Sequence, residues 1–308
     1  MMHAAQHVPR RAGFVLPAVL WIIVGLSVLT MAGIVAAREG LAAAHNRVEL
    51  GRAAWRAEGC TEAARAAIDD ALADENRADR GWRDLDSLVA GARADEQCEL
   101  VARAAGAALD GNAADEDALA SVLVSNAVPA PRADSLAAAI MDWRDPDAEP
   151  RAGGAERDAY RRARAPVPRD SSFASTAEIL LVRGAASVPG LDTLLGAEPE
   201  RVPLGRAPPA VLAALPGLVP ETVARIIELR ARGELPGELL ALTASLSPGA
   251  RAAFVARYAE LSERATLAPD AWLLSACVSE RADAPRACVE LKLVRAGARA
   301  AVIRRRGS

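Results

Sequence analysis

Hydrophobic positions gather into one uninterrupted run near the start of the chain. Residues 14–37 carry no charge, and a helix of about 24 residues would be about 36 Å long at about 1.5 Å of rise per residue. A hydrocarbon core is about 30 Å thick, so this run predicts a transmembrane helix. Arg10 and Arg11 stand just before it and favour a cytoplasmic N-terminus, with the rest of the chain outside the cytoplasm.

A cleaved secretory signal peptide is the usual alternative for such a run. Its apolar region spans about 7 to 15 residues, whereas here the helical pattern continues beyond Ala37 and no proline follows Pro17 until Pro129. We therefore expect one helix from Phe14 to about Asp70, roughly 85 Å long. Each glycine costs such a helix about 1 kcal/mol relative to alanine, so its outer half is expected to bend or fray at Gly40, Gly51 and Gly59.

Shorter strand-like and helix-like segments follow. Pro129 and Pro131 mark a linker between two of them. Strands are predicted at 97–109, 272–278, 287–295 and 300–304. Helices are predicted at 113–125, 135–141, 210–215, 220–232 and 250–261. The fold class is therefore α+β, with a long N-terminal helix, a small antiparallel sheet built from two distant parts of the chain, and a large inserted, mostly helical domain.

Composition places the chain among folded proteins and argues against an enzyme. Hydrophobic residues make up 52% and charged residues 25% of the 308 positions. The net charge of −3 is not the balance of a nucleic-acid-binding protein. His3 and His7 precede the apolar run, so a Ser-His-Asp or Cys-His site would have to use His45 on the stem. We predict no catalytic residues.

Four cysteines fall outside the membrane in this topology, where a bacterial periplasm permits disulfides. Three pairings exist, and free buried cysteines are the alternative. The strands that carry Cys277 and Cys288 would be brought together by a turn at 279–285, which favours that pair. Cys60 and Cys98 would then join the stem to the first strand.

An acidic block offers candidate metal ligands. Six carboxylates occupy 17 positions, and oxygen ligands suit Ca²⁺; they are Asp142, Asp145, Asp147, Glu149, Glu156 and Asp158. Four of them match an EF-hand register, but Pro150 stands where that loop needs glycine, so a calcium site would have another geometry. Interleaved arginines favour a loop held by ion pairs, and calcium binding is the alternative. Calcium is the only cofactor for which the sequence offers candidate ligands.

The turn 215–218 between two helices resembles a helix-hairpin-helix, whose backbone N–H groups can bind DNA phosphate. Residues 200–234 hold five arginines against four glutamates, a balance that gives phosphate binding little support. Packing is the favoured role, and no nucleic-acid partner is expected. The alternative function is a membrane-anchored periplasmic DNA-binding receptor.

The junction before the apolar run resembles the leader of type IV pilins and type II secretion pseudopilins. A short basic leader ends at Gly13, and Phe14 opens the helix. The resemblance implies that a prepilin peptidase cuts after Gly13 and methylates the new N-terminus at Phe14. Most members carry glutamate at the fifth mature position, where this chain has Ala18.

Ordered blocks further along resemble the minor pseudopilin K family of the type II secretion system, whose members are large and lack that glutamate. The blocks are residues 142–150 with 153–156 and Tyr160, then 174–184, then 210–217. One departure is 204–209, Leu-Gly-Arg-Ala-Pro-Pro, where relatives usually carry an Asn-Thr-Ala turn.

Membership of that family implies a structural subunit rather than an enzyme. The subunit would sit with minor pseudopilins I and J at the tip of the periplasmic pseudopilus and help to start its assembly for secretion across the outer membrane. It would span the inner membrane once, with its N-terminus cytoplasmic and its C-terminal domain periplasmic. The expected organisation is a leader at 1–13, a transmembrane helix at 14–37, a stem at 38–75, a pilin-like domain at 76–110 and 268–308, and an inserted helical domain at 111–267.

Overall fold

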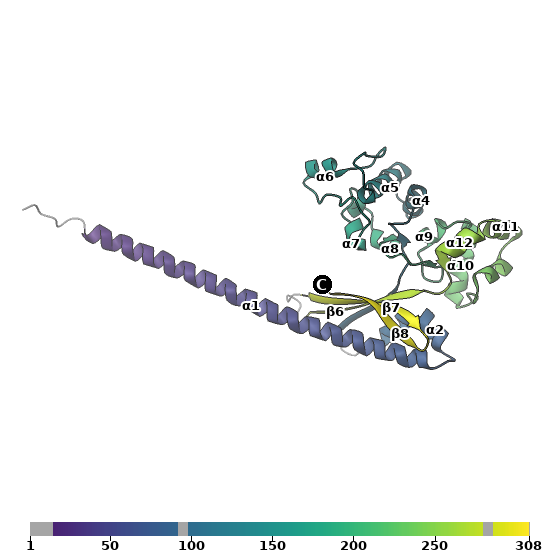
Figure 1. The fold of residues 1–308 in the computed structure, drawn as a ribbon, viewed down its shortest axis with the longest axis horizontal. Coiled ribbons are helices and arrows are strands. Elements are labelled where there is room, and N and C mark those ends of the chain that lie inside the picture. The colour runs from purple at the N-terminus through teal and green to yellow at the C-terminus, as the bar shows by residue number, and fades with distance from the viewer. Residues whose placement is uncertain (1–14, 92–97, 280–285, 308) are drawn as a thin grey trace, which may run out of the picture.

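The computed structural model describes residues 15–91, 98–279 and 286–307. It begins with helix α1 (Val15–Ala73), 59 residues long, which extends bare from the rest of the molecule over its first half (Figure 1). The helix passes the three stem glycines without a break, so the expected fraying is wrong. The C-terminal part of α1 buries a stripe of side chains at helical spacing, formed by Ala53, Ala57, Cys60, Ala64, Ile68 and Leu72. Packing of this stripe against the sheet outweighs the low helix propensity of glycine in that part of the helix.

The sheet that receives this stripe has four antiparallel strands in the order β1-β6-β7-β8. They are β1 (Cys98–Ala104), β6 (Ala271–Ser279), β7 (Arg286–Ala296) and β8 (Arg299–Gly307). Alternate residues such as Leu100, Leu274 and Leu291 face α1 and form one core with it. Strand β1 thus pairs with β6, which begins almost 170 residues after β1 ends. This agrees with the prediction that the sheet is built from two distant parts of the chain.

Two short helices, α2 (Ala78–Arg83) and α3 (Leu85–Gly91), connect α1 to β1. Trp82 of α2 is buried, and its indole N–H donates to the carbonyl oxygen of Pro269 at 2.7 Å. The indole of Trp272 donates in turn to the carbonyl oxygen of Trp82 at 2.9 Å. These two bonds fasten the end of the stem to the start of β6.

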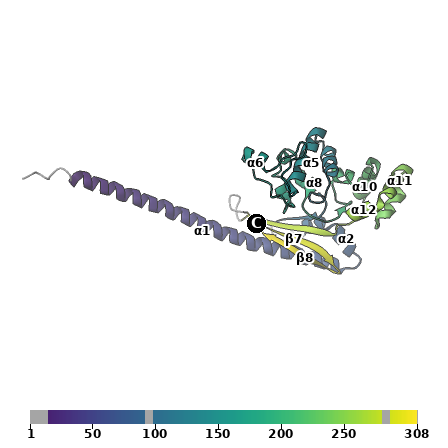
Figure 2. The same cartoon turned by 45° about the horizontal axis from the view of Figure 1, so that its top comes forward.

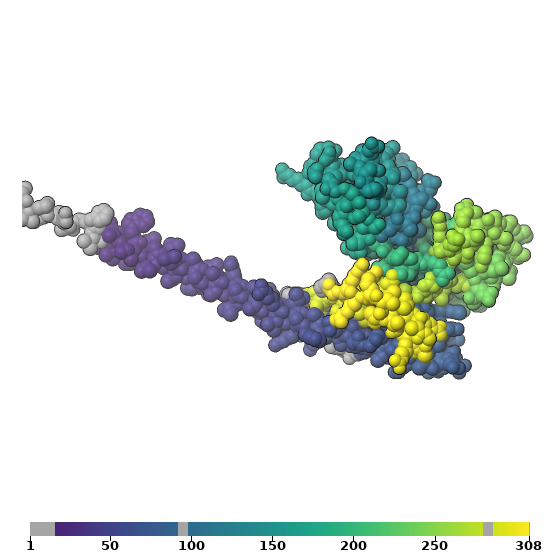
Figure 3. Space-filling model, in the orientation of Figure 1, coloured from purple at the N-terminus to yellow at the C-terminus, as the bar shows by residue number. Residues whose placement is uncertain are grey.

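The segment between β1 and β6 is mostly helical and lies on the face of the sheet opposite α1 (Figure 2). In the space-filling view it rises above the sheet as a teal and a green mass (Figure 3). Its helices are α4 (Glu116–Ser125), α5 (Ala130–Arg144), α6 (Arg157–Ala163), α7 (Thr176–Ile179), α8 (Leu191–Leu194), α9 (Pro209–Ala213), α10 (Pro220–Arg232), α11 (Pro248–Ala256) and α12 (Tyr258–Arg264), with 3-10 turns at Ala185–Ser187 and Leu239–Ser245. Two parallel bridges tie it together, β2 (Leu109–Asp110) with β3 (Leu195–Gly196) and β4 (Val202–Pro203) with β5 (Ala265–Thr266).

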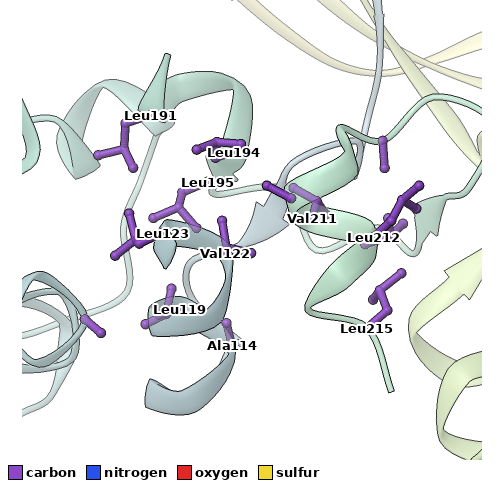
Figure 4. Packing of buried hydrophobic residues seen from close by; sticks show 14 of the residues in the cluster. Ala114, Leu119, Val122, Leu123, Leu191, Leu194, Leu195, Val211, Leu212 and Leu215 are labelled. Carbon is purple, nitrogen blue, oxygen red and sulfur yellow. The ribbon is translucent and has the colours of Figure 1, made fainter. Parts of the chain in front are cut away.

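One hydrophobic core runs through this inserted segment. Leucine and valine side chains of α4 meet those of α8, β3 and α9 in its centre, with Leu123, Leu195 and Leu212 fully buried (Figure 4). The predicted fold class, with a long helix, a small antiparallel sheet and a helical insertion, is confirmed.

Helix boundaries differ most from the predictions at two places. Helix α5 begins at Ala130 rather than 135, because Pro131 occupies the first turn, where a helix needs no N–H and tolerates proline. The expected linker at Pro129 and Pro131 is therefore the start of a helix. The predicted helix 250–261 is divided at Arg257, whose backbone leaves the helical region between α11 and α12.

Buried charges join the inserted segment to the sheet. Lys292 of β7 is the only lysine in the chain, and its Nζ lies 3.1 Å from Oε2 of Glu198 and also contacts Glu200. Arg304 of β8 donates to Glu198 at 2.8 Å. Burial opposes ionisation of Glu198, but the hydrogen bonds from Arg304 and Lys292 outweigh it and lower the pKa of that carboxyl.

Candidate membrane anchor and metal centre

The N-terminal half of α1 presents apolar side chains in every direction. Its most apolar window has a mean hydropathy of 2.4 and no residue buried inside the protein; Leu20, Trp21 and Ile22 are more than half exposed. Among the described residues this is the one helix long and apolar enough to cross a bilayer. The helix is therefore compatible with a single-pass anchor. Gly13 and Phe14, the expected processing site, lie outside the described residues.

The acidic block lies where α5 ends and α6 begins. Asp142, in the last turn of α5, is fully buried and accepts hydrogen bonds from the backbone N–H of Arg151 at 3.2 Å and from its Nη1 at 2.9 Å. The Arg151 guanidinium also pairs with Asp145. Hydrogen bonds to Asp145 and Asp142 raise the pKa of Arg151. Asp142 is thus committed to an ion pair that shapes the loop.

Gly154 lets the loop approach this carboxylate. A Cβ at position 154 would collide with Oδ2 of Asp142, so only glycine fits. Arg183 donates to the carbonyl oxygens of Gly153 and Gly154 at 2.8 and 2.6 Å. The sequence blocks at 142–160 and 174–184 therefore meet at one place.

Three carboxylates beside this ion pair converge. One oxygen from each of Asp145, Asp147 and Glu156 lies within 4.8 Å of the other two. Glu156 is only 6% exposed, and both its oxygens, with Oδ1 of Asp145, are buried without a hydrogen-bond partner among the described residues. Burial and the nearby Asp142 and Asp145 raise the pKa of Glu156. Such a group of oxygen donors with excess negative charge fits a hard cation such as Ca²⁺.

The other members of the predicted set of six face elsewhere. Asp142 is held by Arg151, and Asp158 is exposed and lies 3.3 Å from Arg161. Glu149 is exposed, and its backbone N–H donates to Oδ1 of Asp147 at 2.9 Å. The structure therefore brings together three of the six candidates rather than all of them.

Sequence reasoning missed Asp170 near this cluster. Its carboxylate pairs with Arg157, one of its oxygens is buried without a partner among the described residues, and its charge contributes to the raised pKa of Glu156. Asp170 follows two prolines, outside the acidic block, and adopts a left-handed backbone with φ of 54°. No linear spacing pointed to it.

Aromatic residues pack together beside the acidic loop. The rings of Trp143 and Tyr160 pack edge to face with centroids 5.0 Å apart, and Trp143 stacks on Phe173 at 6.4 Å. The Tyr160 hydroxyl accepts from the backbone N–H of Arg183 at 3.0 Å. These rings form a core that fixes the acidic loop.

The cysteines form two disulfides. Cys60 of α1 is bonded to Cys98, the first residue of β1, with Cα atoms 6.5 Å apart. Cys277 and Cys288 face each other in the β6–β7 register, with Cα atoms 4.2 Å apart. The first bond joins the stem to the sheet and the second joins two neighbouring strands.

The hairpin between α9 and α10 is packed against α11. Leu215 and Leu218 are buried, and Gly217 has a φ of 76°. A Cβ on Gly217 would lie 3.1 Å from the carbonyl oxygen of Ala253 and 3.0 Å from Cβ of Arg257. The glycine permits this close approach, which supports the packing role of the turn.

Comparisons with known proteins bear on the same region. Residues 84–188, which contain the acidic loop and its aromatic support, match the family model described as type II secretion system (T2SS), protein K. No curated protein matches the chain. Among solved structures, the chain is similar to a chain of the GspK-GspI-GspJ complex from the enterotoxigenic Escherichia coli type 2 secretion system. The TM-score is 0.59 at 16% identity, over 86% of this chain and 99% of that chain. At this identity the likeness establishes the fold.

Proposed function

We propose that this chain, a member of the type II secretion system protein K family through residues 84–188, is the minor pseudopilin at the tip of the periplasmic pseudopilus. The observation that carries the proposal is the bare apolar half of α1, continuous with a stem that supports a folded head. An exposed apolar surface of this length needs lipid or neighbouring helices. The family is a structural part of a secretion apparatus, and the chain acts by assembly.

Its shape suits a terminal position. The inserted helical segment projects to one side of the sheet (Figure 2), so a subunit stacked directly above would have to make room for it. Ala18 stands where a glutamate could pair with the N-terminal amine of a neighbour, and a buried carboxylate in lipid needs such a partner. A subunit at the tip helps to start assembly and needs no such neighbour above it.

Processing and orientation follow from the leader. A prepilin peptidase would cut after Gly13 and methylate Phe14, leaving α1 in the mature protein with its N-terminus towards the cytoplasm and the head in the periplasm. N-terminal sequencing of the native protein should begin at methylated Phe14. A sequence that began beyond Ala37 would remove the anchor and refute the proposal.

The partners proposed are the I and J minor pseudopilins of the same secretion system. The similar solved complex contains GspK, GspI and GspJ, and this chain shares the fold over most of its length. Co-expression and affinity purification of this chain with the I and J proteins, from detergent-solubilised membranes, should recover all three together. Recovery of this chain without either protein under those conditions would count against a tip complex.

A calcium ion held by Asp145, Asp147 and Glu156 belongs to the same proposal. The unpartnered buried oxygens of Glu156 and Oδ1 of Asp145 support it, because a buried carboxylate oxygen without a partner raises the free energy of the folded state until a cation binds. Calorimetry should detect calcium binding that Glu156→Gln weakens. An unchanged melting temperature after addition of a chelator would reject the site.

A further inference from the structure

A polar cleft of about 770 Å³ opens between α2 and the C-terminal end of α10. Residues 76–84 form one wall, and the turn at 205–208 with Arg230 and Gly233 forms the other. Helix α2 begins at Ala78, shortly after α1 ends at Ala73, and both α2 and α10 lie at the end of the molecule away from the apolar anchor (Figure 1). Its volume falls within the range of about 300–1,000 Å³ that is usual for ligand sites.

Four arginines line this cleft, and one of them is fully engaged. Arg206 pairs with Asp84 and Asp86 at 2.6 and 2.8 Å and lies 5.7 Å above the ring of Trp272. It belongs to the segment 204–209, which departs from the family pattern. Arg206 therefore clasps the inserted segment to the sheet domain and positions the cleft.

The other three arginines keep donors free. Arg230 is half-buried and donates to the carbonyl oxygen of Ala207 at 2.8 Å, with no ion pair among the residues that the structure describes. Burial and the charge of Arg206 lower the pKa of Arg230. Arg80 and Arg83 are exposed and form no ion pair at 4 Å or less within the described ranges; the charge of Arg83 acts on Asp79 only as a minor cause of the lowered pKa of that carboxyl. The two carboxylates of the cleft are already used, Asp84 by Arg206 and Asp79 by Arg295.

Apolar side chains complete the lining. Leu235, Pro236, Leu267 and Pro269 border the same space as the guanidinium groups. Arginine matches a carboxylate with two parallel hydrogen bonds, and such bonds strengthen where apolar neighbours exclude water. Anionic lipid headgroups cannot reach the site, because the length of the stem separates it from the membrane anchor.

We propose that this cleft binds an acidic peptide segment of a protein partner, whose carboxylates are held by Arg80, Arg83 and Arg230. The apolar wall accommodates the aliphatic parts of the same segment. This inference stands on the geometry of this chain and goes beyond the tip assignment, so the cleft can bind its ligand whether or not the I and J proteins co-purify.

The test uses the full chain in detergent micelles and a fluorescein-labelled hexaglutamate peptide, with fluorescence anisotropy as the readout. The triple variant Arg80→Gln, Arg83→Gln, Arg230→Gln should lose affinity by about tenfold or more, since each charge-assisted hydrogen bond is worth about that factor. The matched control Arg162→Gln, Arg264→Gln, Arg299→Gln removes three exposed charges outside the cleft and should bind like the wild type. The double variant Arg80→Gln, Arg83→Gln changes only exposed side chains, so it should keep the wild-type melting temperature and still bind about tenfold more weakly, since at least one charge-assisted hydrogen bond is lost.

Binding should weaken as salt rises from about 50 to 500 mM, because surface ion pairs are screened. Equal affinities of the cleft and control variants would overturn the proposal, as would an absence of peptide binding to the wild type. Inorganic phosphate or duplex DNA that bound more tightly than the peptide would also overturn it, in favour of a different anion.

Discussion

Replacing Lys292 with methionine should destabilise the protein far more than removing an exposed cation from the same strand. The Lys292 side chain is 7% exposed, and its partners Glu198 and Glu200 are 12% and 14% exposed. Methionine keeps the length and packing of the side chain but removes its charge. Two buried carboxylates would then share the single cation of Arg304.

The size of the effect follows from the desolvation of this cluster. Removing one member of a buried ion pair costs about 3–5 kcal/mol, because the other is left buried and uncompensated. Arg304 still donates to Glu198 at 2.8 Å, so we expect the lower end, about 3 kcal/mol. For a protein of this size that corresponds to a fall of about 6–12 °C in the melting temperature.

The effect should also depend on pH. Burial opposes ionisation of Glu198, but hydrogen bonds from Arg304 and Lys292 leave its pKa below the usual value. The stabilisation is therefore fully present above the unfolded pKa of about 4.3 and is lost as pH falls through the folded pKa. The difference between wild type and Lys292→Met should be largest near neutral pH and shrink in acid.

Urea unfolding of the full chain in detergent, followed by circular dichroism, measures the difference in free energy of unfolding. Arg295→Met is the matched control, since Arg295 lies on the same strand but pairs with Asp79, which is 75% exposed; exposed pairs contribute about 1 kcal/mol or less. Adding Glu200→Gln to Lys292→Met should restore part of the loss. Equal destabilisation by the two methionine substitutions would refute the buried-cluster reasoning.

Three further predictions concern the loop and the disulfides. Gly154→Ala should destabilise the protein by about 1–3 kcal/mol, because the added methyl group collides with Asp142. The control Gly237→Ala adds a methyl group in open space and should change the free energy of unfolding by less than about 0.5 kcal/mol. Equal effects of the two substitutions in thermal melts would contradict the close approach of residue 154 to Asp142. The pKa of Glu156 is raised in the folded protein, so ionisation of this carboxyl lowers the free energy of unfolding as pH rises above about 4.3. Glu156→Gln should therefore raise the melting temperature in chelator at pH 7 and abolish any gain from calcium. A variant that melts below the wild type in chelator would contradict this. Replacing both cysteines of the Cys60–Cys98 pair with serine should lower the free energy of unfolding by about 4 kcal/mol, and the same change in the Cys277–Cys288 pair by about 3 kcal/mol. The first disulfide closes a loop of 38 residues and the second one of 11, and a longer loop loses more entropy when it is closed. The reverse order in urea unfolding would count against this argument.

Much of the acidic site was foreseeable from residue types, but its geometry was not. The run of carboxylates identified the loop, and proline at position 150 excluded a standard calcium loop. Which carboxylates converge depends on the path of the loop: Asp142 is fully buried and accepts from both the backbone and the side chain of Arg151, and it lies outside the group of three converging carboxylates. Asp170 follows two prolines in the sequence and comes close to Glu156 only in the folded chain, so no local sequence pattern connects the two residues.

Local patterns were enough to predict the elements, because hydrophobic period, proline and glycine act over a few residues. They indicated the apolar helix, the strands that place Cys277 opposite Cys288, and the helical insertion. Contacts between distant segments needed the folded chain. Lys292 pairs with Glu198, 94 residues away. Arg206 donates to the carbonyl oxygen of Arg83 in α2 and to the carboxylate of Asp86 in α3. Both contacts arise because the inserted domain packs on the sheet in one orientation. A charged side chain pairs with a carboxylate from a distant segment only after packing has brought the two surfaces together. Periodicity along the sequence does not predict which distant side chains become neighbours.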